Sequence, residues 1–159
     1  MNEQNHKTMQ ATSFEEVLEQ ILIKDTRYHR DAYLFLRDAL DHTRKMLDRE
    51  TKAEKGSKRG ATQEQHVTGQ ELLAGIRELG LEMFGPMAMT VFEEWGIHAC
   101  PDFGEMVFIM VESRLLKKTD KDTRADFESG YDFHEAFQKP FLPQNRMAKI
   151  LKEPKVTKA

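Results

Sequence analysis

Large apolar residues recur along this chain at the three- and four-residue spacing of amphipathic α-helices. Ser13 and Glu16 form a capping-box pattern ahead of the first such run, which predicts that a helix begins there. A second helix is expected over residues 30–47, where the apolar spacing repeats after a polar turn. Residues 13–47 are therefore predicted to form a helical hairpin. The apolar face of its first helix consists of Phe14, Val17, Leu18, Ile21 and Leu22.

Residues 48–65 interrupt this pattern, because they contain no large apolar side chain and two glycines. A segment without apolar anchors has nothing to bury against a core, so we predict a solvated, mobile loop. Helical extension of the preceding segment is the alternative, since its lysines and glutamates favour helix.

Strong start and stop signals return after this loop. Thr68 and Glu71 form a second capping box, and Val67 and Leu72 are placed to make a hydrophobic staple across it. The helix that begins here is predicted to run until Gly85, because the proline that follows cannot continue it.

Two more helices are expected before residue 117. Pro86 suits the first position of a helix that should end at Gly96, with Ile97 completing a Schellman cap. Asp102 and the glutamate three residues later form another capping-box pattern. This pattern predicts a helix over residues 103–116.

Residues 117–130 depart from helical spacing, and we interpret them as two short extended pieces around a polar turn. A helix near residues 123–127 is the alternative. Three helices followed by a hairpin are typical of a winged helix, so residues 66–138 are predicted to form a winged-helix-like unit. The expected fold class is mainly α: an N-terminal helical hairpin packed on a winged-helix-like three-helix unit with a short β-hairpin.

An aromatic segment follows this unit and is expected to pack back on the body of the protein. Beyond it, a short amphipathic helix is predicted over residues 146–153. The aromatic residues are Tyr131, Phe133, Phe137 and Phe141.

Composition agrees with one folded domain, at 159 residues with 39% apolar and 32% charged side chains. We place this domain at residues 1–138 and a basic tail at residues 139–159. The longest apolar run, Met106 to Val111, is far shorter than the roughly 20 residues that cross a bilayer. Cys100 is the single cysteine, and the first thirteen residues lack the apolar stretch of a secretion signal. We therefore expect a cytoplasmic protein with no membrane contact.

The formal net charge of -3 hides an uneven distribution, with -8 over residues 66–138 and +5 over residues 139–159. The expected recognition helix carries two glutamates against Arg114, so phosphates should repel it. Any nucleic-acid binding should be weak, nonspecific and dependent on the tail. The candidate tail contacts are Arg146, Lys149, Lys152 and Lys155.

Three stretches together resemble a family of conserved hypothetical bacterial proteins that is known chiefly from planctomycetes and verrucomicrobia. They are ILIKDTRYHRDAYLFLRDAL, HVTGQELLAGIRELGLEMFGPMAMTVFEEWGI and DFGEMVFIMVESRLLKKTDKDTRADFESGYDFHEAF. The resemblance covers residues 14–137, and HVTGQELL and FGPMA are its most specific parts. It implies a bacterial cytoplasmic setting, and it carries over no catalytic residue.

Histidines and carboxylates that lie close in sequence give one candidate polar site, made of His29, Asp31, His66 and Glu71. Helix capping already explains Glu71, and His66 precedes its helix. His98 and Cys100 lack the paired spacing of a zinc site, so no metal or cofactor is expected.

These observations favour a non-catalytic protein-interaction or regulatory module that presents its acidic surface to an unknown protein partner. The alternative is a nucleic-acid-associated regulator that binds through the basic tail. A third hypothesis is a small enzyme built on the histidine and carboxylate residues named above.

Overall fold

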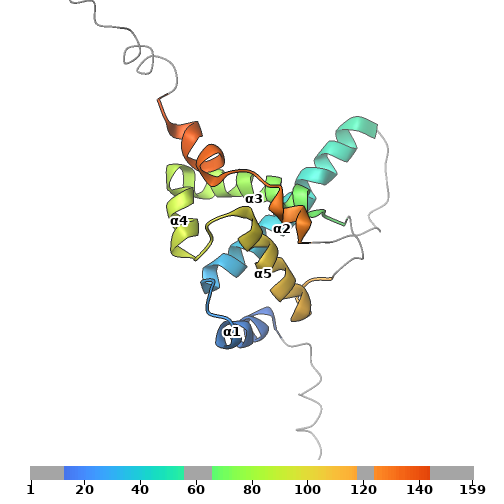
Figure 1. The fold of residues 1–159 in the computed structure, drawn as a ribbon. Helices are drawn as coiled ribbons and strands as arrows, with labels where there is room; N and C mark the ends of the chain where they lie inside the picture. Colours follow the sequence, from blue (N-terminus) through green and yellow to red (C-terminus); the bar gives the residue numbers. More distant parts are fainter. Residues whose placement is uncertain (1–12, 56–65, 118–123, 144–159) are drawn as a thin grey trace, which may run out of the picture.

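The structure is a computed structural model that describes residues 13–55, 66–117 and 124–143. These residues are mainly helical, and no strand occurs among them (Figure 1). The elements are α1 (Phe14–Lys24), α2 (Arg30–Lys55), α3 (Gly69–Phe84), η2 (Gly85–Met87), α4 (Ala88–Glu94), α5 (Cys100–Glu112), α6 (Ala125–Glu128), η3 (His134–Gln138) and η4 (Lys139–Phe141).

The predicted helix starts at Ser13 and Thr68 are confirmed. Ser13 Oγ accepts a hydrogen bond from the amide of Glu16, and Thr68 Oγ1 accepts one from the amide of Glu71. Each hydroxyl thereby satisfies an amide that has no partner inside its own helix. On α1, the buried residues Leu18 and Ile21 lie on the predicted apolar face.

Helices α2 and α3 form a closely packed antiparallel pair. Phe35 near the start of α2 packs against Phe84 at the end of α3, with ring centroids 5.8 Å apart. Halfway along, Thr43 faces Gly75, where any Cβ would overlap the threonine hydroxyl. The absence of a side chain at Gly75 therefore lets the two helices approach each other closely.

Phe92 of α4 lies at the centre of the aromatic core and is fully buried. Its ring contacts those of Phe35, Phe103 and Phe137 at centroid distances of 5.3, 5.6 and 5.1 Å. The aromatic segment thus packs back on the body as predicted, although Phe141 at its end is 45% exposed. Burial of these rings supplies a large share of the hydrophobic free energy of folding.

The Schellman cap predicted at Gly96 is also confirmed. Gly96 has a φ of 87°, and the amides of Gly96 and Ile97 donate to the carbonyls of Glu93 and Phe92. A Cβ on Gly96 would also collide with the carbonyl of Arg27. This glycine therefore both ends α4 and admits the turn between α1 and α2.

Several predicted boundaries are wrong: α5 ends at Glu112 instead of residue 116, and α4 begins at Ala88 after a 3-10 turn that contains Pro86. Helix α2 continues to Lys55, so residues 48–55 of the predicted loop are helical, as the alternative of helical extension allowed. Lysine and glutamate favour helix, which accounts for this continuation, and the end of α2 projects beyond the other helices (Figure 1). Residues 56–65 lie outside the described residues.

The start of α5 differs from the prediction by three residues. The N-cap is Ala99, and Asp102 occupies the third helical position instead of the cap. Its carboxylate reaches back and accepts hydrogen bonds from the amides of His98 and Ala99. The aspartate still satisfies free amides, but from inside the helix.

The winged-helix interpretation and its β-hairpin are not supported. Residues 125–128 of the predicted hairpin form α6, as the alternative reading allowed, and residues 118–123 lie outside the described part. Buried Phe127 docks α6 against Gly104 of α5. The helix predicted at residues 146–153 lies outside the described residues as well.

Candidate functional site

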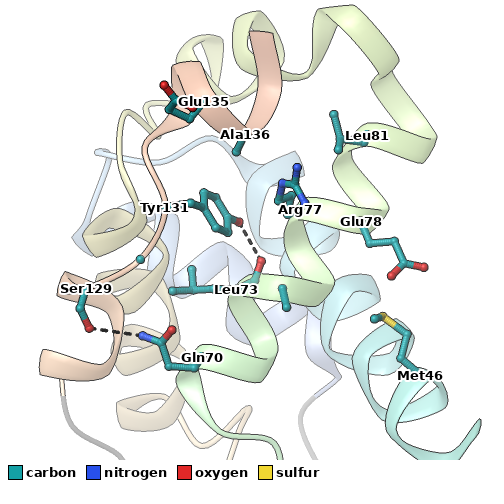
Figure 2. Close-up of a pocket in the computed structure, with 12 residues that line it drawn as sticks. Met46, Gln70, Leu73, Arg77, Glu78, Leu81, Ser129, Tyr131, Glu135 and Ala136 are labelled. Carbon is teal, nitrogen blue, oxygen red and sulfur yellow. Dashed lines mark hydrogen bonds between the residues drawn. The ribbon is translucent and has the colours of Figure 1, made fainter. Parts of the chain in front are cut away.

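The described surface has hollows that are large enough for a ligand or a partner segment, and two of them bear on function. The first, which we call the Tyr131 groove, has a volume of about 790 Å³ and runs along α3 between Met46 of α2 and residues 129–136 (Figure 2). Its lining consists of Met46, Gln70, Leu73, Ala74, Arg77, Glu78, Leu81, Ser129, Gly130, Tyr131, Glu135 and Ala136.

Tyr131 forms one wall of this groove and is held from two sides. Its hydroxyl donates to the carbonyl of Leu73 at 2.8 Å (Figure 2). Its own carbonyl accepts from the thiol of Cys100 at 3.2 Å. Burial raises the pKa of the Tyr131 hydroxyl well above its usual value, so this group stays a neutral donor at neutral pH. The wall is therefore both fixed and uncharged.

Charged side chains stand on the rim of the Tyr131 groove. Glu135 pairs with Lys139 at 3.0 Å, and Glu78 Oε1 lies 3.4 Å from His42 Nε2. Arg77 makes no hydrogen bond or ion pair with any other described residue, and its positive charge lowers the Tyr131 pKa slightly against the effect of burial. The rim thus offers charges of both signs beside an apolar floor.

The second hollow, which we call the α2–α5 groove, has a volume of about 640 Å³ and is more apolar. It lies on the other side of the start of α3, where α2, α5 and α6 converge. Its lining consists of Phe14, Arg37, Asp38, Leu40, Asp41, Arg44, His66, Val67, Thr68, Gly69, Leu72, Val107, Phe108, Met110, Val111, Leu115, Leu116, Lys117 and Phe127.

Helix α2 carries charges along the edge of the α2–α5 groove. The guanidinium of Arg37 lies 4.6 Å from the ring centroid of Phe14 and 3.7 Å from the carboxylate of Asp38. Asp41 pairs with Lys45 at 3.0 Å. Arg44 lines the groove without an ion pair or hydrogen bond to any residue of the described ranges.

The predicted polar site separates into two pairs. His29 Nδ1 accepts from the amide of Asp31 at 3.1 Å, just before α2, and the amide of His29 donates to the carbonyl of Trp95. Both side chains are more than half exposed, and they line neither groove. This pair serves to begin α2 and to fix it against the end of α4.

The other pair lies at the opposite end of the α2–α3 pair. Glu71 Oε1 accepts from the hydroxyl of Thr68 at 2.9 Å as part of the capping box, and His66 lines the α2–α5 groove. Arg44, which lines the same groove, follows the start of α2 by fourteen residues, a rise of about 20 Å. The structure therefore does not bring His29 and Asp31 together with His66 and Glu71.

Other polar groups singled out from the sequence have structural partners. Cys100 is 2% exposed, and burial raises the pKa of its thiol to about 11, so it is a poor nucleophile at neutral pH. No group of three or more metal-ligating side chains occurs within the described ranges. The predicted tail contacts Arg146, Lys149, Lys152 and Lys155 lie outside them.

Sequence reasoning missed both grooves. On α3, Gln70, Ala74, Arg77 and Leu81 follow helical spacing, and this stripe was a detectable signal for one exposed face. Nothing in their spacing shows that Tyr131 would stand beside them. No helix of the described residues has the length and hydropathy needed to span a membrane.

Comparison of the chain with protein-family models, with curated proteins and with solved structures finds no match. The resemblance to a bacterial family therefore stays a prediction, and the site must be interpreted from its own geometry.

Proposed function

We propose that this protein is a non-catalytic interaction module that receives a segment of a protein partner in the Tyr131 groove. The observation that carries this proposal is the shape of the groove, an open channel along α3 with a fixed wall at Tyr131. An open groove with an apolar floor and a charged rim suits an extended or helical peptide, which can bury some side chains and leave others in water.

Charge supports a basic partner. The region that contains α3 and Tyr131 carries a net charge of -8, and Glu78 and Glu135 stand on the groove rim more than half exposed. Lysine or arginine side chains of a partner would meet Glu78 and Glu135 there, and an acidic side chain would meet Arg77, so a segment with a basic excess fits the rim and associates faster at low salt. Apolar side chains of the same segment would cover the partly buried Leu81 and Tyr131 side chains.

The separation of the polar residues also favours binding over catalysis. A general acid and base must lie within hydrogen-bond reach of one reacting atom. The His29 pair instead lies at the start of α2 and the Glu71 pair at the start of α3, and both pairs are engaged in helix starts. This arrangement supports the interaction hypothesis over the enzyme hypothesis.

The test is capture of partners by the full-length protein, followed by titration of each purified candidate. Ala74 is exposed on the groove floor, so Ala74→Trp fills the groove without entering the core. We expect this variant to weaken partner binding by about tenfold or more, because it removes the space that the partner occupies.

Met83→Trp is the matched control, because Met83 is 53% exposed on the same helix and does not line the groove. It should bind the partner like the unsubstituted protein. A partner that binds Ala74→Trp with unchanged affinity does not use this groove, and such a result would refute the proposed function.

A further inference from the structure

The α2–α5 groove has the chemistry of a site for a small amphipathic ligand. Its interior is lined by aliphatic side chains of α2, of α5 and of the turn after α5 that are only partly buried, so their free surface faces one shared space. Covering such surface is favourable by about 25 cal/mol per Å². A volume of about 640 Å³ lies within the usual range for small-molecule pockets.

The bottom of the groove is set by the core. Leu72, Met110 and Phe127 line it and are each at least 96% buried, so the space ends on side chains that cannot move aside. Leu40 and Leu116 extend the apolar wall towards solvent and are half buried. A flexible hydrocarbon chain fits such a channel better than a rigid polar molecule.

The edge of the groove selects the head group. Its lining contains three basic and two acidic side chains, with histidine counted as neutral, in a protein whose total charge is -3. Asp38 and Asp41 are each matched by a cation within 3.7 and 3.0 Å. Arg44 has no such counterion among the described residues, so within the described part of the groove it supplies one uncompensated positive charge.

We propose that the α2–α5 groove binds an unbranched aliphatic monocarboxylate, with its chain on Leu40, Leu72 and Leu116 and its carboxylate on Arg44. The planar guanidinium of arginine pairs with a carboxylate through two parallel hydrogen bonds. One uncompensated charge favours a singly charged head group over a doubly charged one. This site is separate from the Tyr131 groove, so a test of one proposal does not affect the other.

The experiment is calorimetric titration of the full-length protein with decanoate, decan-1-ol and butyrate, each below its aggregation concentration. We expect saturable binding of decanoate and no detectable binding of butyrate. Decan-1-ol should bind with an affinity at least about tenfold lower than that of decanoate. A charged hydrogen bond of about 1.5–3 kcal/mol corresponds to roughly 10- to 100-fold in affinity.

Arg44→Gln should weaken decanoate binding to the level of decan-1-ol and leave decan-1-ol binding unchanged. Arg49→Gln is the matched control, because Arg49 is exposed on the same helix but lines neither groove. Val111→Trp places a larger side chain in the groove and should weaken both ligands. Circular dichroism checks that each variant is folded.

Absence of saturable decanoate binding would overturn the proposal. Equal affinities for decanoate and decan-1-ol, or an Arg44→Gln variant that binds decanoate like the unsubstituted protein, would overturn the assigned head group. Unchanged binding to a folded Val111→Trp variant would place the ligand elsewhere and overturn the assigned site.

Discussion

The hydroxyl of Tyr28 donates a 2.7 Å hydrogen bond to the carboxylate of Asp102, which lies 74 residues further along the chain. The other oxygen of this carboxylate accepts hydrogen bonds from the amides of His98 and Ala99. A single side chain therefore stabilises the start of α5 and also ties it to the turn between α1 and α2.

Tyr28→Phe is expected to lower the free energy of unfolding by about 1–2 kcal/mol, because the ring remains while a hydrogen bond to a charged acceptor is lost. Urea denaturation measures the change. Asp102→Ala should cost more than Tyr28→Phe, since it also leaves the amides of His98 and Ala99 without their acceptor. Equal stability of Tyr28→Phe and the unsubstituted protein would show that this contact contributes nothing.

Thr68→Ala should lower stability by about 0.5–2 kcal/mol, because it removes the acceptor for the amide of Glu71 at the start of α3. Thr90→Ala on α4 is the control, since Thr90 is exposed inside a helix and alanine favours helix. The melting temperature of Thr68→Ala should fall, and that of Thr90→Ala should stay the same or rise. A Thr68→Ala melt that matches the control would mean that α3 does not depend on this cap.

Gly75→Ala should destabilise the α2–α3 pair by about 1–3 kcal/mol, because its Cβ would overlap the hydroxyl of Thr43. Thr43→Ala removes that hydroxyl. The double variant should therefore be more stable than the sum of the single changes predicts, by at least about 0.5 kcal/mol. Strict additivity in chemical denaturation would show that the two residues do not meet.

Stability should decline in alkali. Burial raises the pKa of the Cys100 thiol from 9.0 to about 11 and that of Tyr33 from 10.0 to about 12. A group whose pKa is higher in the folded state than in the unfolded state contributes fully to folding stability below its unfolded pKa. This contribution is lost as the pH rises from the unfolded pKa through the folded pKa. The melting temperature should thus be steady to about pH 9 and fall from there towards pH 11 and above.

Cys100→Ala tests the cause of this decline, because it removes one of the raised groups. Its melting temperature should fall less steeply with pH than that of the unsubstituted protein, whatever the two values are at pH 7. Parallel curves for the two proteins would rule out the buried thiol as a contributor.

Duplex DNA should bind weakly, without sequence preference, and should be released above roughly 0.2 M salt. A chain that ends at residue 143 should lose this binding, because most of the basic tail is gone. Arg114→Gly is the control: Arg114 has a φ of 62°, which glycine adopts readily, and the change removes the single arginine of the expected recognition helix. Selective binding that survives truncation and is lost in the control would instead favour DNA reading by α5 and the turn that follows it.

Local signals in the sequence determined several features of this protein. The caps at Ser13 and Thr68 and the Schellman end at Gly96 each involve residues within six positions of one another. Their hydrogen bonds form whenever the adjoining helix forms, so they can be recognised without knowledge of the fold. The mainly helical class followed from the same kind of local spacing.

The end of α2 and the start of α5 were harder, because the sequence allows two local solutions at each. The sequence of residues 48–55 is compatible with a solvated loop and with a helix. The carboxylate of Asp102 can cap α5 either as the residue before the helix or from the third helical position. In the second case, the hydrogen bond from distant Tyr28 favours the arrangement seen.

The presence and position of the two grooves depend on the tertiary structure alone. Tyr131 meets Leu73 across 58 residues, and Phe127 of α6 closes the same hollow that Arg44 of α2 edges. Contacts of this kind depend on how the helices pack against one another. The apolar spacing of a helix predicts which of its faces is buried, but it does not predict which other helix will cover that face. The sequence by itself therefore determined the helices and their caps, while the packing of distant side chains decided where a partner or ligand can bind.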